Sequence, residues 1–362
     1  MKKKVLLSMS IALLLVGLAT PVAYAGAATP SSVYTNDNAA SGNSILQYSA
    51  GHDGALTLVG IFSTGGSGTG SALASQGAIA ITQNGQWLIT VDAGSNQITS
   101  FHVNPDGSLD RASTVSSQGT SPVSVTIRGN VVYVLNAGTN VKDGSIAGFT
   151  LSKTGHLSFI TGSVESLLGG AGSSPEQIGF TDDGRVLVVA EKAVNLIDTF
   201  VVTKGIAGSP SATPSNSPAP YGFAFNNHGF LVISEAATGT LSSYSVSDNG
   251  ALKTVSDSVP DFGLAPCWVA ISPDGRVAYT SNAHGGTISS YRVSGTGTLT
   301  LSSSVAGTAS TPTLDLALNN NGHTLYALNG GEITSYHASH DGSLATLSSV
   351  PAPASSTGLV TV

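Results

Sequence analysis

The sequence predicts an all-β fold, a seven-bladed β-propeller closed by pairing of strands from the two ends of the chain. Three observations lead to this prediction. Short apolar runs alternate with turns that contain Gly, Asn or Asp along the whole chain. The runs recur in groups of four, at intervals typical of propeller blades. Glycine accounts for 44 of the 362 residues and charged residues for only 9%, a composition that disfavours long helices.

The first 25 residues have the organisation of a secretory signal peptide. Lysines at positions 2–4 precede an apolar run from Val5 to Leu18, and Ala23-Tyr24-Ala25 offers a small-residue cleavage site. The run is shorter than the roughly 20 apolar residues that a membrane span needs. Retention of the segment as an anchor is the alternative. We expect residues 26–362 to form an exported propeller, secreted or held in the periplasm or cell envelope, with no segment inserted in a membrane.

Charge and cysteine content exclude several classes of partner. Cleavage after residue 25 removes three of the 13 basic residues, which leaves 10 against 20 acidic ones and a net charge of −10. No basic cluster remains, so neither nucleic acid nor an anionic membrane surface is an expected partner. Cys267 is the only cysteine, so no internal disulfide can form. We expect a monomer stabilised by packing.

The repeat is clearest in the sixth unit, where Pro266–Ile271, Val277–Asn282 and Thr287–Tyr291 are successive apolar runs. In each unit the second run ends in an acid or amide. In the six complete units these ends fall at positions 92, 136, 191, 235, 282 and 329. Runs rich in Val, Ile, Thr and Tyr at this spacing predict four short strands per blade. The stretch from 208 to 220 is expected to be a longer connection between blades.

The two ends of the chain together supply one further blade, which brings the number of blades to seven. Val33–Asp37 matches a second run with no first run before it, and Ser44–Tyr48 and Leu56–Phe62 follow as third and fourth runs. Gly358–Val362 matches a first run with nothing after it. Pairing of these segments would close the ring and leave no open sheet edge.

A glycine-containing turn is expected between the third and fourth strands of every blade. A tight hairpin needs a positive backbone angle, which glycine adopts without strain. The turn glycines are Gly54, Gly107, Gly155, Gly205, Gly250, Gly297 and Gly342. Asp-Gly turns also bind calcium in some repeat proteins, but no ligand-rich loop surrounds these. We therefore expect hairpins, no metal site and no cofactor, with calcium as the alternative.

The second-strand ends predict a ring of polar side chains at one mouth of the channel. In an up-and-down blade, the second strand ends and the first strand begins on the same face. The second strands end in Asp37, Asp92, Asn136, Glu191, Glu235, Asn282 and Asn329. Near the first-strand starts stand Ala78, Ser124, Gln177, Gly222, Trp268 and Asp315. From these sets we expect Asp92, Asn136, Gln177, Trp268, Asn282, Asp315 and Asn329 to bind a substrate.

Such a ring can raise the pKa of one carboxylate, chelate a hard cation, or bind a polar ligand by hydrogen bonds. The alternative is that these side chains satisfy backbone groups of the adjacent loops. Glu191 and Glu235 are the preferred catalytic candidates because glutamate is a poorer turn residue. His284 follows Asn282 in a loop above the same mouth and is the third candidate. Trp268 can stack on a ligand or pack against the next blade.

Signatures of other chemistries are missing from the sequence. It contains no Gly-x-Ser-x-Gly, no His-x-x-x-His, no paired cysteines and no glycine-rich phosphate loop followed by a helix. Serine-based hydrolysis and zinc catalysis therefore have no local support.

The repeats resemble those of the lactonase-type seven-bladed propellers, which include 6-phosphogluconolactonases and proteins labelled 3-carboxymuconate cyclase. Pro266–Asn282 followed by Thr287–Tyr291 carries the resemblance, which spans residues 33–362. It implies a lactone-opening site at the channel mouth built from arginine, histidine and glutamate, with Glu191, Glu235 and His284 at matching positions. The arginine expected after Asn282 is replaced by Ala283, which disfavours a phosphorylated sugar lactone.

Two functions follow as hypotheses. The first is an exported hydrolase that opens a neutral lactone or related cyclic ester. Glu191 or Glu235 would activate water, and Asn136 and Asn282 would donate hydrogen bonds to the oxyanion. The alternative is a non-catalytic propeller that recognises a glycan, a peptide or a component of the cell envelope at the same mouth, because the fold alone does not determine function.

Overall fold

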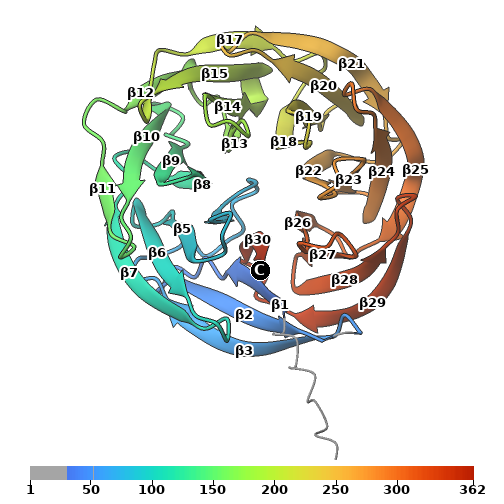
Figure 1. Ribbon diagram of the computed structural model, residues 1–362, viewed down its shortest axis with the longest axis horizontal. Coiled ribbons are helices and arrows are strands. Elements are labelled where there is room, and N and C mark those ends of the chain that lie inside the picture. Colours follow the sequence, from blue (N-terminus) through green and yellow to red (C-terminus); the bar gives the residue numbers. More distant parts are fainter. Residues whose placement is uncertain (1–30, 52) are drawn as a thin grey trace, which may run out of the picture.

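The computed structural model of the chain describes residues 31–51 and 53–362. Seven small antiparallel sheets surround a central axis, as Figure 1 shows. Apart from one short 3-10 turn (η1, Lys192–Val194), the regular elements of the described residues are strands. No helix in this part of the chain is long and apolar enough to cross a membrane. The predicted seven-bladed propeller is confirmed, whereas the predicted signal peptide lies outside the described residues.

Each blade runs from the axis outward. The innermost strands are β4 (Ile79–Ile81), β8 (Pro122–Arg128), β13 (Pro175–Phe180), β18 (Pro220–Phe225), β22 (Pro266–Ile271), β26 (Thr313–Leu318) and β30 (Thr357–Thr361). The second strands are β1 (Ser31–Asn36), β5 (Trp87–Asp92), β9 (Val131–Asn136), β14 (Val186–Glu191), β19 (Phe230–Glu235), β23 (Val277–Asn282) and β27 (Thr324–Asn329). The third strands are β2 (Ser44–Ala50), β6 (Gln97–Val103), β10 (Asp143–Leu151), β15 (Leu196–Thr203), β20 (Thr240–Val246), β24 (Thr287–Val293) and β28 (Glu332–Ala338).

The outer strands vary most between blades. Five blades have one outer strand each: β3 (Leu56–Ser63), β7 (Leu109–Ser116), β21 (Leu252–Pro260), β25 (Leu299–Thr308) and β29 (Leu344–Pro351). In two blades the outer strand is split, into β11 (Leu157–Phe159) with β12 (Glu165–Ala171) and into β16 (Ile206–Ala207) with β17 (Ser211–Pro214). The stretch from 208 to 220 is therefore not only a connection, because β17 pairs with β15 within it.

Burial explains why the second strands read as continuous apolar runs. A blade packs against a neighbour on each face, so both sides of a second strand are covered. Thus β14 is buried along its whole length, and β9 is buried at every position after its first. The outer strands face solvent, and β29 is exposed or half-buried throughout. Second strands, which are covered on both faces, are therefore continuously apolar, whereas outer strands such as β29 are not.

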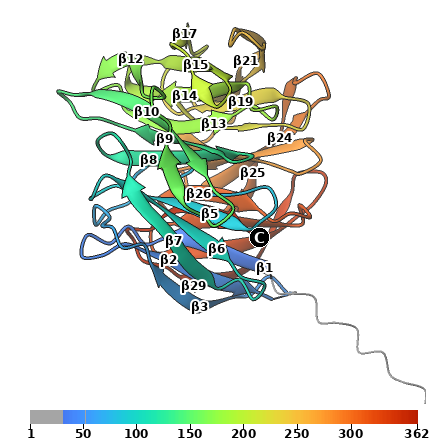
Figure 2. The ribbon, with the colours of Figure 1, turned by 60° about the vertical axis from the view of Figure 1, so that its left-hand side comes forward.

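The blade built from both termini closes the ring. Its strand order is β3-β2-β1-β30, with Tyr34 opposite Val360. The backbone N–H of Val362 donates to the carbonyl of Ser32 at 2.9 Å. The hydroxyl of Thr35 donates to the carbonyl of Gly358 at 2.7 Å. Figures 1 and 2 both place the C-terminus beside β1. The predicted closure is confirmed.

A repeated hydrogen bond joins neighbouring blades at the predicted glycine turns. The seven turn glycines have φ between +77° and +92°, as hairpins of this kind require. In four blades a third-strand hydroxyl donates to the carbonyl of the glycine in the next turn: Ser100 to Gly155 at 2.6 Å, Thr199 to Gly250 at 2.9 Å, Ser243 to Gly297 at 2.7 Å and Ser335 to Gly54 at 2.7 Å. The last of these bonds crosses the closure, so the pattern continues from the seventh blade into the first.

Removal of residues 357–362 tests the closure. The deletion exposes the edge of β1 and leaves the Asp315 carboxyl without the N–H of Leu359, which it accepts at 3.1 Å. We expect the midpoint of thermal unfolding to fall by about 10 °C or more, with aggregation at the open edge. Circular dichroism and size-exclusion chromatography measure both. The peptide Thr-Gly-Leu-Val-Thr-Val added in trans should restore part of the loss, and a scrambled peptide should not. An unchanged midpoint would contradict the role of β30.

Candidate functional site

The polar ends of the second strands all lie on the face that carries the loops between second and third strands. In the first blade this position is Asn36 and not Asp37, because β1 ends one residue earlier than expected. Asp37 instead accepts the backbone N–H groups of Ala39 and Ser44 within the loop. The seven ends, Asn36, Asp92, Asn136, Glu191, Glu235, Asn282 and Asn329, are completely buried. None of them presents a side chain to solvent.

Asp92 shows what most of these side chains contact. Its carboxylate accepts the amide of Asn43 at 2.7 Å and the hydroxyls of Thr64 and Thr99 at 2.5 and 2.7 Å. Asn43 and Thr64 belong to the preceding blade and its connection, so the carboxylate ties two blades together. A Cβ atom at Gly66 would lie 2.6 Å from the Cβ of Asp92. All three donors are side chains, whereas the structural alternative expected backbone groups of the loops, and substrate binding by Asp92 stays a prediction.

The asparagines of the ring make similar contacts. Their amide nitrogens donate to nearby oxygens: Asn136 to the Ser117 carbonyl at 3.1 Å, Asn282 to the Thr287 and Ser289 hydroxyls at 2.9 Å each, and Asn329 to the Thr334 hydroxyl at 3.0 Å. The carbonyl oxygens of these three amides have no hydrogen-bond partner within the described residues. Substrate binding by Asn136, Asn282 and Asn329 stays a prediction.

Glu235 has both carboxylate oxygens occupied. Oε1 accepts the hydroxyls of Ser215 and Ser242 at 3.1 and 2.9 Å and the backbone N–H of Ser217 at 2.9 Å. Oε2 accepts the hydroxyl of Thr240 at 2.7 Å. Ser215 and Ser217 lie in the connection from the preceding blade. The carboxylate is therefore an anchor of that connection, and a catalytic role for it stays a prediction.

Glu191 differs from Glu235 because a second carboxyl group adjoins it. Oε1 of Glu191 accepts the backbone N–H of Gly169 at 3.0 Å, and Asp198 accepts that of Leu168 at 2.8 Å. The other oxygen of each carboxyl has no hydrogen-bond partner within the described residues. Burial, reinforced by the charge of Asp198, raises the pKa of Glu191 to about 7. Burial also raises the pKa of Asp198, so the two groups titrate as a pair.

Gln177 and Asp315 lie at the start of inner strands and bind neighbouring blades. The amide of Gln177 donates to the carbonyl of Phe223 at 2.9 Å and accepts its N–H at 2.6 Å. Asp315 accepts the backbone N–H groups of Leu316 at 2.8 Å and Leu359 at 3.1 Å. Burial raises the pKa of Asp315 well above its usual range. Both side chains line a central cavity of about 370 Å³.

A segment that the sequence did not mark crosses this mouth. Residues 65–77 connect β3 to β4, and Figure 1 shows the chain before β4 reaching into the middle of the ring. The amide of Gln76 donates to the carbonyl of Val269 at 2.7 Å and accepts its N–H at 3.0 Å. The hydroxyl of Tyr221 donates to the carbonyl of Ala74. We call residues 65–77 the mouth segment. It links the second blade to the fifth and sixth across the axis.

Trp268 and His284 have different surroundings. Trp268 is 2% exposed, donates its indole N–H to the carbonyl of Ser75 at 3.1 Å, and packs edge-on against Tyr221 at 5.3 Å between ring centroids. It thus holds the mouth segment and packs against the preceding blade, and ligand binding by Trp268 stays a prediction. His284 is exposed, in the loop between β23 and β24, and its backbone N–H donates to the carbonyl of Leu264. Its predicted catalytic role remains a prediction.

An ion pair that the sequence did not predict lies beside the mouth segment. Lys192 contacts the carboxylate of Glu176, which also accepts the hydroxyl of Ser174 at 2.9 Å. The ammonium lies 4.9 Å from the centre of the Tyr221 ring. Burial raises the pKa of Glu176, and the nearby Lys192 opposes this shift. The sequence holds one indication of this ion pair. Glu176 follows the proline at the start of its repeat, a position at which three other blades have Val123, Tyr221 or Cys267.

The described residues give no support for a bound cation. Within 31–51 and 53–362, no group of three or more His, Cys, Asp and Glu side chains is placed to hold a metal ion. The calcium alternative has no candidate cluster there.

Comparison with known proteins identifies the family. The family described as lactonase, 7-bladed beta-propeller, matches residues 33–167 and 203–315. The chain belongs to this lactonase family. The match includes Glu235 and His284 but not the stretch that contains Glu176, Glu191 and Lys192. A comparison with curated proteins found no match.

Solved structures of similar fold cover nearly the whole chain. They include candidate 6-phosphogluconolactonases from Bacteroides fragilis (TM-score 0.69, 17% identity, covering 92% of this chain and 98% of that one) and Bacteroides uniformis (TM-score 0.70, 18% identity, 92% and 99%). A periplasmic gluconolactonase from Pseudomonas aeruginosa has a TM-score of 0.69 at 17% identity, covering 92% and 99%. Because these structures are only 17–18% identical to this lactonase-family protein, the similarity shows a shared fold and does not by itself show a shared activity.

Glu235→Ala tests the anchoring role. The substitution leaves the N–H of Ser217 and three hydroxyls without their acceptor, so we expect the free energy of unfolding to fall by about 3 kcal/mol. Urea denaturation measures this difference. Glu165→Ala, on the half-buried start of β12, is the control and should change stability little. Equal stability of the two variants would contradict the anchoring role.

The pH dependence of stability tests the Glu191–Asp198 pair. The pKa of Glu191 is raised to about 7 from 4.5, so the folded state keeps a proton that the unfolded chain releases. This contribution is fully present below about pH 4.5 and is lost as the pH rises to about 7. Glu191→Gln is neutral throughout, so the melting temperature of this variant should fall less over that range. Glu165→Gln is the control. Parallel profiles for the wild type and Glu191→Gln would show that the pair is not linked to folding.

Proposed function

We propose that this protein is an exported hydrolase that opens a lactone or a related cyclic ester. Membership of the lactonase family supports the reaction class. The observation that carries the proposal is the Glu191–Asp198 pair, in which the pKa of Glu191 is raised to about 7. A general base works best when its pKa lies near the working pH, and burial, reinforced by the charge of Asp198, raises the pKa of Glu191 into that range.

In the proposed reaction Glu191 accepts a proton from water as the oxygen of that water adds to the lactone carbonyl carbon. The ring C–O bond then breaks, and the leaving oxygen takes the proton back from Glu191. Lys192, the next residue, has a side chain that is 33% exposed and supplies positive charge for the oxyanion. The amides of Asn136 and Asn282 donate to protein oxygens, and the Lys192 ammonium contacts Glu176, so each of these groups would have to exchange its partner for the oxyanion.

Access to Glu191 requires local opening. The carboxyl is covered by residues 168–173, and a Cβ atom at Gly169 would lie 2.4 Å from its Oε2. This segment is held by the hydrogen bonds of Leu168 and Gly169 to the two carboxyls. Leu168 is 52% exposed, so little apolar packing opposes an outward movement. We propose that substrate enters by displacing this segment.

Export is part of the proposal. The organisation of residues 1–25 supports it, as does the periplasmic location stated for the similar gluconolactonase from Pseudomonas aeruginosa. The N-terminal sequence of the protein recovered from the exported fraction should begin at Gly26.

A lactone panel tests the activity. The purified exported protein is assayed by pH-stat with glucono-δ-lactone, 6-phosphogluconolactone, and aliphatic and aromatic lactones. We expect turnover of at least one neutral lactone, and a fall in kcat of about 100-fold or more in Glu191→Gln. Glu165→Gln, in the preceding blade, should retain activity. Inactivity on every lactone, or full activity of Glu191→Gln, would overturn the proposal.

The second candidate is a non-catalytic binding propeller. The mouth segment favours it, because Gln76 and Ser75 occupy the entrance where a substrate would approach the axis. Under this alternative every lactone is left unchanged and a glycan or peptide binds instead. The panel therefore separates the two candidates.

A further inference from the structure

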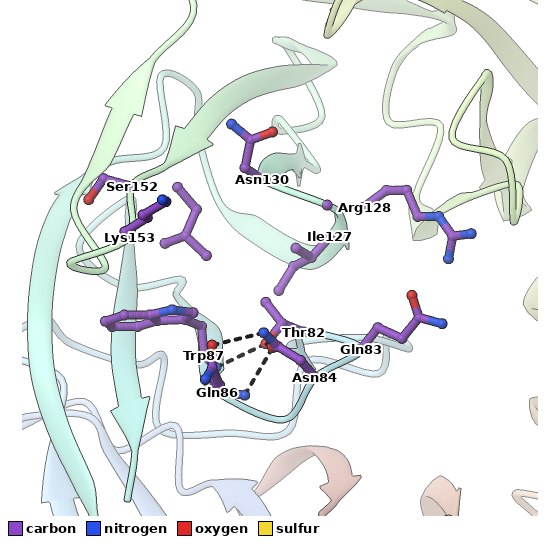
Figure 3. A pocket seen from close by; sticks show the side chains of 12 residues that line it. Thr82, Gln83, Asn84, Gln86, Trp87, Ile127, Arg128, Asn130, Ser152 and Lys153 are labelled. Atoms are coloured by element: carbon purple, nitrogen blue, oxygen red, sulfur yellow. Dashed lines mark hydrogen bonds between the residues drawn. The ribbon is translucent and has the colours of Figure 1, made fainter.

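A groove on the other face of the ring has no part in the proposed hydrolysis. It lies between the second and third blades and has a volume of about 660 Å³ (Figure 3). The turn from β4 to β5, the turn from β8 to β9 and the start of the β10–β11 hairpin form its walls. These turns lie on the face opposite the end of β14, where Glu191 is found. Its volume is typical of small-molecule sites.

The floor of the groove is apolar and includes a fixed indole. Trp87, Ile127 and Leu151 line it, with the Trp87 ring on one side in Figure 3. The imidazole of His102 packs edge-on against the indole at 5.1 Å between centroids. A Cβ atom at Gly155 would lie 2.0 Å from the ring, so this turn accepts the indole only because it has glycine there. The indole is therefore held in one orientation where it lines the groove.

The rim is polar and carries positive charge. The hydroxyl of Thr82 donates to Asn84 at 2.7 Å, and the amide of Asn84 donates to Gln86 at 2.8 Å, contacts drawn in Figure 3. Arg128 and Lys153 add two cations, and none of the twelve lining residues is Asp or Glu. Among the described residues, the cations found in ion pairs are Arg185 and Lys192. In Figure 3 Lys153 lies on the same side of the groove as Trp87, whereas Arg128 extends away from both along the rim. Neither has a protein counter-charge among the described residues.

The equivalent groove between the sixth and seventh blades shows that this chemistry is not imposed by the fold. Its volume is about 330 Å³, and its turn repeats the local hydrogen bond, with Ser272 donating to Asp274 at 2.5 Å. It has Asp274 where the first groove has Asn84, Val277 where it has Trp87, and His340 where it has Lys153. The same backbone frame therefore carries a carboxylate in one groove and cations with an indole in the other.

We propose that the groove between the second and third blades binds an anionic carbohydrate, a sugar that carries a carboxylate. The C–H face of a pyranose ring packs on the indole of Trp87. The amides of Asn84 and Gln86 bind hydroxyl groups, which act as both donor and acceptor. Lys153 and Arg128 bind carboxylates by charge-assisted hydrogen bonds, each at its own end of the groove. In a chain with 13 basic and 20 acidic residues, two cations with no acid beside them select an anion.

Calorimetry with tetragalacturonate as probe, and the neutral tetrasaccharide of galactose as comparison, tests the proposal on the exported protein. We expect binding of tetragalacturonate only, weakening as the salt concentration rises. Trp87→Val and Asn84→Asp introduce the residues of the equivalent groove. The first should weaken binding about tenfold, and the second should weaken it several-fold by adding a carboxylate. Asp274→Asn is the matched control and should leave binding unchanged.

Three results would overturn the proposal: no heat with millimolar tetragalacturonate, equal binding of the neutral tetrasaccharide, or unchanged binding by Asn84→Asp. Equal affinity for inorganic phosphate would show a simple anion site and would also overturn the assignment to a sugar. The melting temperature of Trp87→Val shows whether this variant is folded. If Trp87→Val does not fold, binding by Asn84→Asp still tests the proposal. Glu191→Gln should bind tetragalacturonate as the wild type does. The test of this groove is therefore independent of the test of the proposed hydrolysis.

Discussion

The backbone pairing of β1 with β30 is the interaction on which the rest of the structure depends. Every blade is covered on both faces by its neighbours, and a ring with one break would expose two of these faces at once. The pairing also brings the N–H of Leu359 to the buried carboxyl of Asp315, which lines the central cavity. The two faces, the central cavity and the grooves between blades all exist because the ring is closed.

The closed ring separates two kinds of polar chemistry. On one face, carboxylates and amides at the ends of the second strands are buried and hold the connections between blades, with Glu235 as the most completely bonded example. On the other face, polar side chains stand on turns and remain open to solvent. Because the repeat imposes the same backbone on every blade, side chains that differ from their equivalents in the other blades are candidates for a role beyond folding. Glu191 beside Asp198, Glu176 among apolar equivalents, and Trp87 in its groove are such side chains.

Family membership and local geometry support different parts of the functional argument. The lactonase match establishes the kind of propeller and makes ring-opening chemistry the leading hypothesis. It does not extend over the stretch that contains Glu191, so the role of that residue depends on the paired carboxyls and on the opening of the segment above them. The mouth segment adds a constraint of its own. Tyr221 and Trp268 hold it across the axis, so a substrate that approaches along the channel from this side would meet it.

The sequence by itself determined the number of blades, the closure by both termini and the hairpin glycines, because each depends on the alternation of residues within a few positions. It also placed the polar strand ends on one face, since that follows from strand direction. Only the tertiary structure decided that these ends are buried, because their partners come from distant segments: Asp92 meets Asn43, and Glu235 meets Ser217. The same holds for the mouth segment, in which Gln76 meets Val269, and for the groove where Trp87 and Lys153 converge. The alternation of residues along a strand indicates which side of the strand faces inward. Which group covers that side depends on chain segments that are distant in the sequence and meet only in the packed structure.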